Sequence, residues 1–288
     1  MDDRFARHMP LFGAEGQERI AGTRVAVIGV GGVGSHVVQQ LALLGVREFA
    51  LVEPEELDDT NRNRFIGSHH DDPVPGTPKL EIANRLVTAI APTARVQRIP
   101  ATLVSDAAFN LVKAADVVFG CIDKEAPRLI LTELCSAYER NYIDVASDVL
   151  PGSPPEWGGC VCTSWNGAAC LVCLGELDID EAGRQLAGPD GEEQRRAIYG
   201  VDETLLAGGG PSVVSVNGVV ASLAVTEFMA GVTGLREPVP LMTYRGWSGI
   251  VTKKTEPHAN CYFCGTIRGR GEAADVERYI RDGVGEYL

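Results

Sequence analysis

Two Cys-x-x-Cys pairs are the most specific chemical signal in the sequence: Cys170 with Cys173, and Cys261 with Cys264. Together they supply four thiolates, which is the ligand set of a tetrahedral Zn²⁺ site. The two pairs lie too far apart in the chain for a zinc finger. We expect a structural zinc ion that ties the C-terminal segment to the body of the protein. The alternative is two unrelated redox-active or buried cysteine pairs.

A glycine-rich turn is the second signal. Gly29-x-Gly31-x-x-Gly34 follows a short β-branched run and precedes an amphipathic stretch, and Glu53 ends the next apolar run. Such glycines permit a tight turn and close approach of the backbone to phosphate, and a carboxylate at the end of the second strand can bind ribose hydroxyls. These residues predict a nucleotide site. A glycine-rich turn that binds nothing is the alternative.

The residues after Glu53 differ from those of a dehydrogenase. Asn61-x-x-Arg64 follows the strand, and Lys79 opens the next helix, so two positive charges are available for a triphosphate with a leaving pyrophosphate. Asp123 lies just beyond a buried strand, where ligands bind in parallel sheets, and could hold Mg²⁺. Singly, Arg64 and Lys79 could be solvated charges, and Asp123 could be a helix N-cap.

Short β-branched runs alternate with helical stretches in the N-terminal half, which predicts an α/β fold: a Rossmann-like, mostly parallel, twisted sheet flanked by helices. Beyond Pro151 the alternation weakens, and we expect a C-terminal antiparallel extension that includes the hairpin 241–253. Strands are predicted at 24–28, 49–52, 95–99, 116–120, 142–145 and 160–163, and helices at about 37–44, 79–91, 128–140 and after Pro211.

Four segments follow from this pattern: an N-terminal helical segment, a nucleotide-binding half, a C-terminal half, and a tail. The C-terminal half contains a crossover loop (178–210), the long helix and the zinc-binding cysteines. The four segments span residues 1–22, 23–150, 151–266 and 267–288.

Composition excludes several classes of protein. The 288 residues are 45% hydrophobic and carry a formal net charge of −13. A sequence-independent grip on nucleic acid or on an anionic membrane is therefore not expected. Polar residues interrupt the apolar stretch 211–230, which favours a buried helix over a membrane span. We expect a cytoplasmic protein whose remaining cysteines, Cys121, Cys135, Cys160 and Cys162, are small buried apolar residues.

In order and spacing, these motifs resemble the ThiF/MoeB/HesA superfamily of E1-like activating enzymes, over roughly residues 4–266. The resemblance implies ATP-dependent adenylation of the C-terminal carboxylate of a ubiquitin-like protein, sulfur-carrier protein or peptide, with release of pyrophosphate by a homodimer. The motifs that carry it are Gly29–Ser35, Leu51–Glu55, Thr60–Arg64, Gly76–Lys79, Cys121–Asp123, the two cysteine pairs and Ala224–Glu227.

The resemblance also implies individual roles. The glycine turn would contact ATP and Glu53 its ribose, Asp123 would hold Mg²⁺, and Arg7 would reach the ATP of the partner subunit. The residues that would contact the nucleotide and its phosphates are Gly29, Gly31, Gly32, Gly34, Glu53, Thr60, Asn61, Arg64 and Lys79.

This sequence departs from the family pattern in one major respect. Thioester-forming members carry a nucleophilic cysteine before the long helix, and residues 178–210 contain none. We therefore expect adenylation without a covalent enzyme intermediate. Two alternatives remain: an NAD-dependent dehydrogenase with a structural zinc ion, or a non-catalytic E1-like partner that docks a ubiquitin-like protein.

Overall fold

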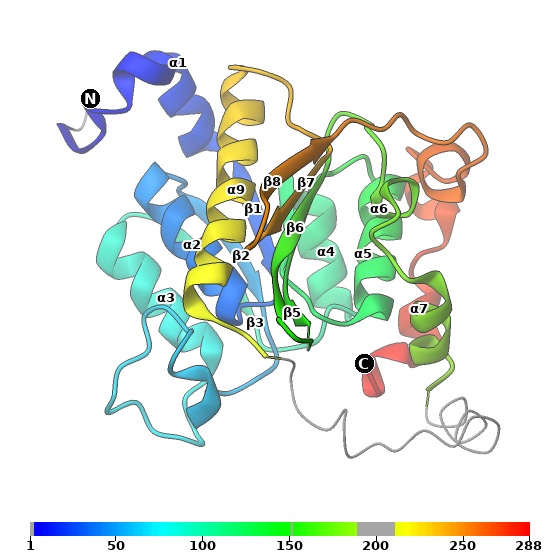
Figure 1. Cartoon of the computed structure of the whole chain (residues 1–288), viewed down its shortest axis with the longest axis horizontal. Coiled ribbons are helices and arrows are strands. Elements are labelled where there is room, and N and C mark those ends of the chain that lie inside the picture. The colour runs from blue at the N-terminus through cyan, green and yellow to red at the C-terminus, as the bar shows by residue number, and fades with distance from the viewer. Residues whose placement is uncertain (1–2, 151, 189–210) are drawn as a thin grey trace.

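Over the described residues, 3–150, 152–188 and 211–288, the computed structural model forms one sheet of eight strands (Figure 1). The order is β3-β2-β1-β4-β5-β6-β7-β8; β1 to β5 are parallel, and β6 to β8 pair antiparallel. The predicted mostly parallel sheet with an antiparallel C-terminal extension is confirmed. The strands are β1 (Arg24–Ile28), β2 (Glu48–Val52), β3 (Arg95–Ile99), β4 (Val117–Gly120), β5 (Asn141–Leu150), β6 (Glu156–Ser164), β7 (Leu241–Arg245) and β8 (Gly249–Lys253).

Helices cover both faces of the sheet. Figure 1 shows α1, α2, α3 and α9 on one side of the strands and α4, α5 and α7 on the other. The α-helices are α1 (Met9–Gly22), α2 (Gly32–Leu44), α3 (Lys79–Ile90), α4 (Asp106–Ala114), α5 (Glu125–Ala137), α6 (Leu171–Leu174), α7 (Ile179–Leu186), α9 (Val214–Thr233) and α10 (Arg278–Arg281). Shorter helical turns are η1 (Asp3–Phe5), η2 (Asp59–Asn61), η4 (Tyr262–Thr266), η5 (Gly271–Ala274) and η6 (Val284–Glu286).

Each face of the sheet has its own core because successive strand residues point to opposite faces. In β1, Val25 and Val27 pack with α2 and α9, whereas Ala26 and Ile28 pack with α4 and α5. The continuous apolar run of β1 is therefore buried on both sides, as in parallel sheets generally.

The long helix α9 is part of the core. By length and composition it is the one helix of the described chain that could cross a membrane, but half of its apolar window is buried inside the protein. Its residues Val220, Ala224 and Phe228 are buried in the same cluster as α2 and the sheet. This packing agrees with the buried helix expected from the sequence.

Some elements differ from the prediction. Helix α4 was not expected; its N-cap is Ser105, whose hydroxyl accepts a hydrogen bond from Ala108 N at 3.3 Å. Strands β5 and β6 pair as one hairpin and are longer than predicted. The additional residues, mainly 146–150 and 156–159, have a weak apolar pattern, so the sequence did not indicate them. Of the predicted crossover loop, the first part contains α7, and residues 189–210 lie outside the described residues. The four-segment division stays a prediction.

Candidate functional site

The glycine turn joins β1 to α2 at the carboxyl edge of the parallel strands. Gly29 has a φ of 85°, and a Cβ there would lie 2.5 Å from the Cys121 carbonyl oxygen. A Cβ on Gly34 would lie 2.1 Å from the Gly29 carbonyl oxygen, so this glycine permits α2 to pack against the turn. At Gly31 a Cβ would meet no atom within 4 Å. The turn is therefore closed on its inner side and open at Gly31.

Glu53 holds the glycine turn from the end of β2. Its Oε2 accepts a hydrogen bond from Val30 N at 2.8 Å, and its Oε1 accepts one from Glu55 N at 3.0 Å. Burial raises the pKa of Glu53, while the positive charge of Lys79 opposes that shift. Both carboxylate oxygens of Glu53 already accept hydrogen bonds from backbone N–H groups. A ribose hydroxyl would therefore have to share one of these oxygens with an N–H group.

Arg64 lies against the same turn. Its Cγ and Cδ would be 3.3 Å from a Cβ on Gly32, and its guanidinium donates to the Thr60 carbonyl oxygen. Thr60 N donates to Asp58, and Asn61 Oδ1 accepts from Asp58 N at 3.4 Å. Thr60 and Asn61 thus belong to the small capped turn η2, which positions Arg64.

Lys79 is buried at the start of α3, with a relative exposure of 5%. Its Nζ pairs with the carboxylate of Glu55, and its backbone N donates to the Glu55 carbonyl oxygen at 3.1 Å. The Lys79 charge acts on the pKa of both Glu53 and Asp58. The structure therefore brings Lys79 close to Glu53, at the edge where Arg64 meets the glycine turn.

Asp123 follows β4 at the carboxyl edge and is exposed. The N-cap of α5 is Lys124, so capping does not account for Asp123. Its carboxylate forms no hydrogen bond or ion pair with the residues that the structure describes. It remains available for a cation or for solvent.

Arg7 lies far from the glycine turn of its own chain. The neighbouring Arg4 donates to the carbonyl oxygens of Ala42 and Ile90, at the C-terminal ends of α2 and α3. The glycine turn and Lys79 lie at the other ends of these helices, and 13 residues of α2 span about 20 Å. Figure 1 likewise shows α1 and the loop between β2 and α3 at opposite ends of the molecule.

Asn217 lies against the glycine turn and was not among the residues predicted from the sequence. It is fully buried in α9, and its Nδ2 would lie 2.6 Å from a Cβ on Gly32. Its Oδ1 accepts a hydrogen bond from Ser147 Oγ at 2.8 Å, and its Nδ2 donates to Ser212 Oγ at 3.0 Å. The available signal was an amide inside an apolar helix, since buried polar groups need partners.

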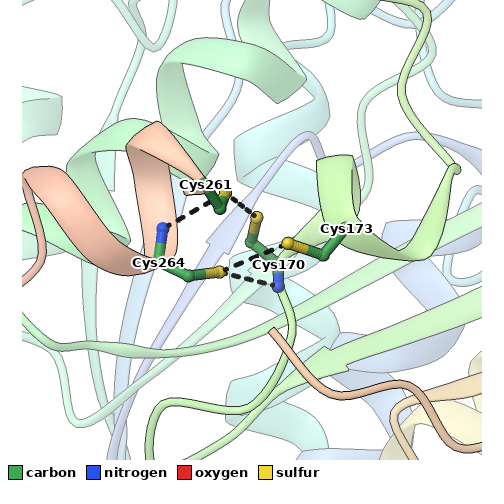
Figure 2. A group of neighbouring side chains, drawn as sticks. All are labelled: Cys170, Cys173, Cys261 and Cys264. Carbon is green, nitrogen blue, oxygen red and sulfur yellow. Dashed lines mark hydrogen bonds between the residues drawn. The ribbon is translucent and has the colours of Figure 1, made fainter. Parts of the chain in front are cut away.

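The four predicted zinc ligands converge from α6 and η4 (Figure 2). The Sγ atoms of Cys170 and Cys261 are 3.7 Å apart, and those of Cys173 and Cys264 are 3.9 Å apart. Zn–S bonds of about 2.3 Å in a tetrahedron require sulfur separations of about 3.8 Å, so the cluster fits zinc. Burial raises the pKa of Cys173 to about 11. Zinc binding would therefore displace protons from these thiols.

Residues 5–267 match the model of the ThiF family. The SAMP-activating enzyme E1 of Haloferax volcanii is 36% identical over 135 residues, covering 46% of this chain and 49% of that protein. The vegetative HesA protein of Trichormus variabilis is 28% identical over 271 residues, covering 90% and 86%.

A solved structure shares the fold. The crystal structure of Escherichia coli MccB with ATP superposes with a TM-score of 0.69 at 19% identity, covering 92% of this chain and 75% of that one. The chain spans about half the length of the Haloferax protein, at 49%, and most of the length of HesA, at 86%.

Proposed function

Because the ThiF model covers nearly all of the chain, the protein belongs to the ThiF family, and we propose that it is an E1-like adenylyltransferase that uses ATP. Its substrate would be the C-terminal carboxylate of a ubiquitin-like protein, a sulfur-carrier protein or a peptide. The products would be an acyl-adenylate and pyrophosphate. The family assignment gives no support to the dehydrogenase alternative.

The observation that carries the proposal is the gathering of charged groups around an open glycine turn. Arg64 packs against Gly32, buried Lys79 acts on Glu53, and Gly31 faces free space. These groups come from separate segments of the chain and meet at the carboxyl edge of a parallel sheet, where open α/β sheets bind ligands. Helix α2 begins at the same turn and offers its N-terminal N–H groups to phosphate.

Charge neutralisation is the main requirement of this reaction. The attacking carboxylate and the triphosphate repel one another, so positive groups must offset charge at the α-phosphate and on the leaving pyrophosphate. Arg64, Lys79 and the partner subunit's Arg7 would supply it, and Lys79 would exchange Glu55 for phosphate. Asp123 would hold Mg²⁺, which would neutralise phosphate charge. No side chain needs to act as a base, because a C-terminal carboxylate is already ionised at pH 7.

The partners follow from the same reasoning. A homodimer is needed if Arg7 acts on the neighbouring site. Residues 178–210 contain no cysteine, so the acyl-adenylate would pass to a separate nucleophile. The H. volcanii relative is named as an activating enzyme for SAMP, and an E. coli MccB structure contains the peptide MccA. We propose that this chain acts in the cytoplasm, on a ubiquitin-like or sulfur-carrier protein or on a peptide.

Substrate-dependent ATP–pyrophosphate exchange tests the proposal. Candidate ubiquitin-like proteins, sulfur carriers and peptides would be supplied, and one of them should stimulate exchange. Lys79→Met should then lower exchange at least about 100-fold, because a buried positive charge at the phosphates is lost. Lys113→Met is the matched control. Lys113 lies on α4 and, like Lys79, pairs with a glutamate, Glu277. Equal losses in both variants would contradict the role of Lys79.

Asp123 is tested in the same assay. Asp123→Asn should lower exchange and raise the Mg²⁺ concentration needed for half-maximal rate, because a carboxylate ligand becomes an amide. Asp106→Asn, at another exposed aspartate beside a helix start, should change neither. Absence of exchange with every carrier, together with no binding of ATP, would instead favour the non-catalytic partner.

A further inference from the structure

A second group of metal-binding side chains lies outside the four-cysteine cluster. Cys160 and Cys162 on β6 and Glu176 beyond α6 place their two sulfurs and a carboxylate oxygen within 4.8 Å of one another. Alternate residues of a strand point to the same face, so both cysteines lie on the side of the sheet that α4 and α5 cover. Their packing in that core agrees with this orientation.

Glu176 is held in place by its backbone. Its N–H donates to the Leu171 carbonyl oxygen at 3.0 Å, and its own carbonyl oxygen accepts a hydrogen bond from Arg128 at 3.0 Å. The Arg128 guanidinium is fixed in turn by two hydrogen bonds to buried Asp144, of 3.2 and 2.7 Å. These contacts fix the backbone of Glu176, and its carboxylate lies near the two cysteine sulfurs of β6.

The side chain of Glu176, by contrast, is not bonded to any residue that the structure describes. It is half-buried, and its carboxylate has no hydrogen-bond donor and no cationic partner among the residues that the structure describes. Both carboxylate oxygens keep contact with solvent, so a cation could replace the water at this position. The positive charge of nearby Arg128 is already matched by Asp144 and Glu125, and it forms no ion pair with the Glu176 carboxylate.

We propose that Cys160, Cys162 and Glu176 form a second metal site, for a thiophilic divalent cation such as Zn²⁺. Two thiolates and one carboxylate are ligands that Zn²⁺ accepts, whereas Mg²⁺ and Ca²⁺ require oxygen ligands throughout. The donors would close by up to about 1 Å to reach tetrahedral separations. Three protein ligands leave the fourth position to water or to an external ligand, unlike the closed four-cysteine site.

The position of this site follows from the strand register. Ile28, Gly120, Asp144 and Cys162 are paired in one row across β1, β4, β5 and β6. Three strand spacings place Cys162 about 14 Å from Ile28, the residue before the glycine turn. The site thus lies beside the carboxyl edge of the sheet but is separate from the nucleotide-binding residues. It does not depend on the proposed adenylation.

Metal stoichiometry tests the proposal on the full-length protein. The protein would be stripped of metal under reducing conditions and titrated with Co²⁺ and then Zn²⁺. About two metal ions per chain are expected, with two sets of Co²⁺ absorption bands because four-sulfur and two-sulfur sites differ in ligand field. The double variant Cys160→Ser/Cys162→Ser should bind about one ion and keep the four-sulfur spectrum, which also reports that it is folded.

Two further variants sharpen the result. Glu176→Gln should weaken the second site by at least about tenfold while leaving the first unchanged. Cys135→Ser removes another buried cysteine from the same core and should keep both ions. One metal ion per wild-type chain, or two in the Cys160→Ser/Cys162→Ser variant, would overturn the proposal.

Discussion

Gly29, Gly31 and Gly34 serve different purposes within one turn. Gly29 adopts a left-handed backbone conformation, and Gly34 permits contact between helix and strand. Gly31 does neither, because its φ is negative and a Cβ would enter open space. Two of the three glycines are thus required by the fold, whereas the fold does not require Gly31, whose open space is where we propose that the nucleotide approaches the backbone.

Alanine substitutions separate these purposes. Gly29→Ala should lower the free energy of unfolding by about 2–4 kcal/mol, because it combines backbone strain with a clash against Cys121. Gly31→Ala should change stability by less than about 1 kcal/mol but weaken ATP binding at least about tenfold. Urea unfolding and calorimetric ATP titration measure the two effects. Wild-type ATP affinity in Gly31→Ala would remove the turn from the nucleotide site.

At the scale of elements, the loop between η2 and α3 connects Arg64 with Lys79 and is fastened by Asp72. The Asp72 carboxylate is buried, accepts two hydrogen bonds of 2.7 Å from Arg85 on α3, and accepts a third from His69 N at 2.7 Å. Arg62 adds bonds to the carbonyl oxygens of His69 and Asp72. The two proposed phosphate-binding residues are therefore linked by an ordered segment.

Removal of the Asp72 charge should loosen this loop. Asp72→Asn should cost about 1–3 kcal/mol of unfolding free energy at pH 7, because Arg85 loses its charged partner. Arg85 holds the pKa of Asp72 well below its usual range, so this stabilisation is present above the unfolded pKa of about 3.9 and is lost as pH falls below it. Urea unfolding from pH 7 to pH 3 should show the difference shrinking. Asp71→Asn, at the exposed neighbouring residue, should have little effect at either pH.

The four clustered cysteines join α6 to the C-terminal segment, and we expect them to bind zinc. Cys170→Ser should lower the zinc content by about one ion per chain and the melting temperature by at least about 5 °C, because metal binding contributes directly to folding. Inductively coupled plasma mass spectrometry and thermal unfolding measure this. Cys135→Ser should keep its zinc and lose less stability. A wild-type chain purified without metal would refute the structural zinc site.

The elements were predictable where local pattern determines them. β1, the glycine turn and the end of α2 follow from an apolar run, fixed glycine spacing and Gly45, whose φ of 106° ends the helix. Arg64 and Lys79 were found because each lies a short distance from a strand or helix end. Asn217 could not be placed at Gly32, because 185 positions separate them in the chain and only the packing of α9 on α2 brings them together.

At the scale of the whole molecule, the protein is acidic, but several of its carboxylates are buried and paired with arginines. The net charge is −13, and several buried carboxylates are matched by arginines: Asp144 by Arg128, Glu227 by Arg236 and Glu133 by Arg278. Arg64 and Lys79 instead lie at the edge of the sheet. Lys79 is paired there with Glu55, so a bound phosphate would have to replace that carboxylate, and the net negative charge disfavours binding to a nucleic acid surface.

Dimerisation gives the sharpest test at this scale, because Arg7 is remote from its own glycine turn. Arg7→Ala and Lys79→Met should each be inactive as homodimers. When the two variants are coexpressed, each mixed dimer should contain one site with wild-type Lys79 and the partner's Arg7. Random pairing makes about half of the dimers mixed, and each mixed dimer has one working site out of two. About a quarter of wild-type pyrophosphate exchange should therefore return. Exchange that stays absent in purified mixed dimers, or full activity in Arg7→Ala alone, would refute the sharing of Arg7 between subunits.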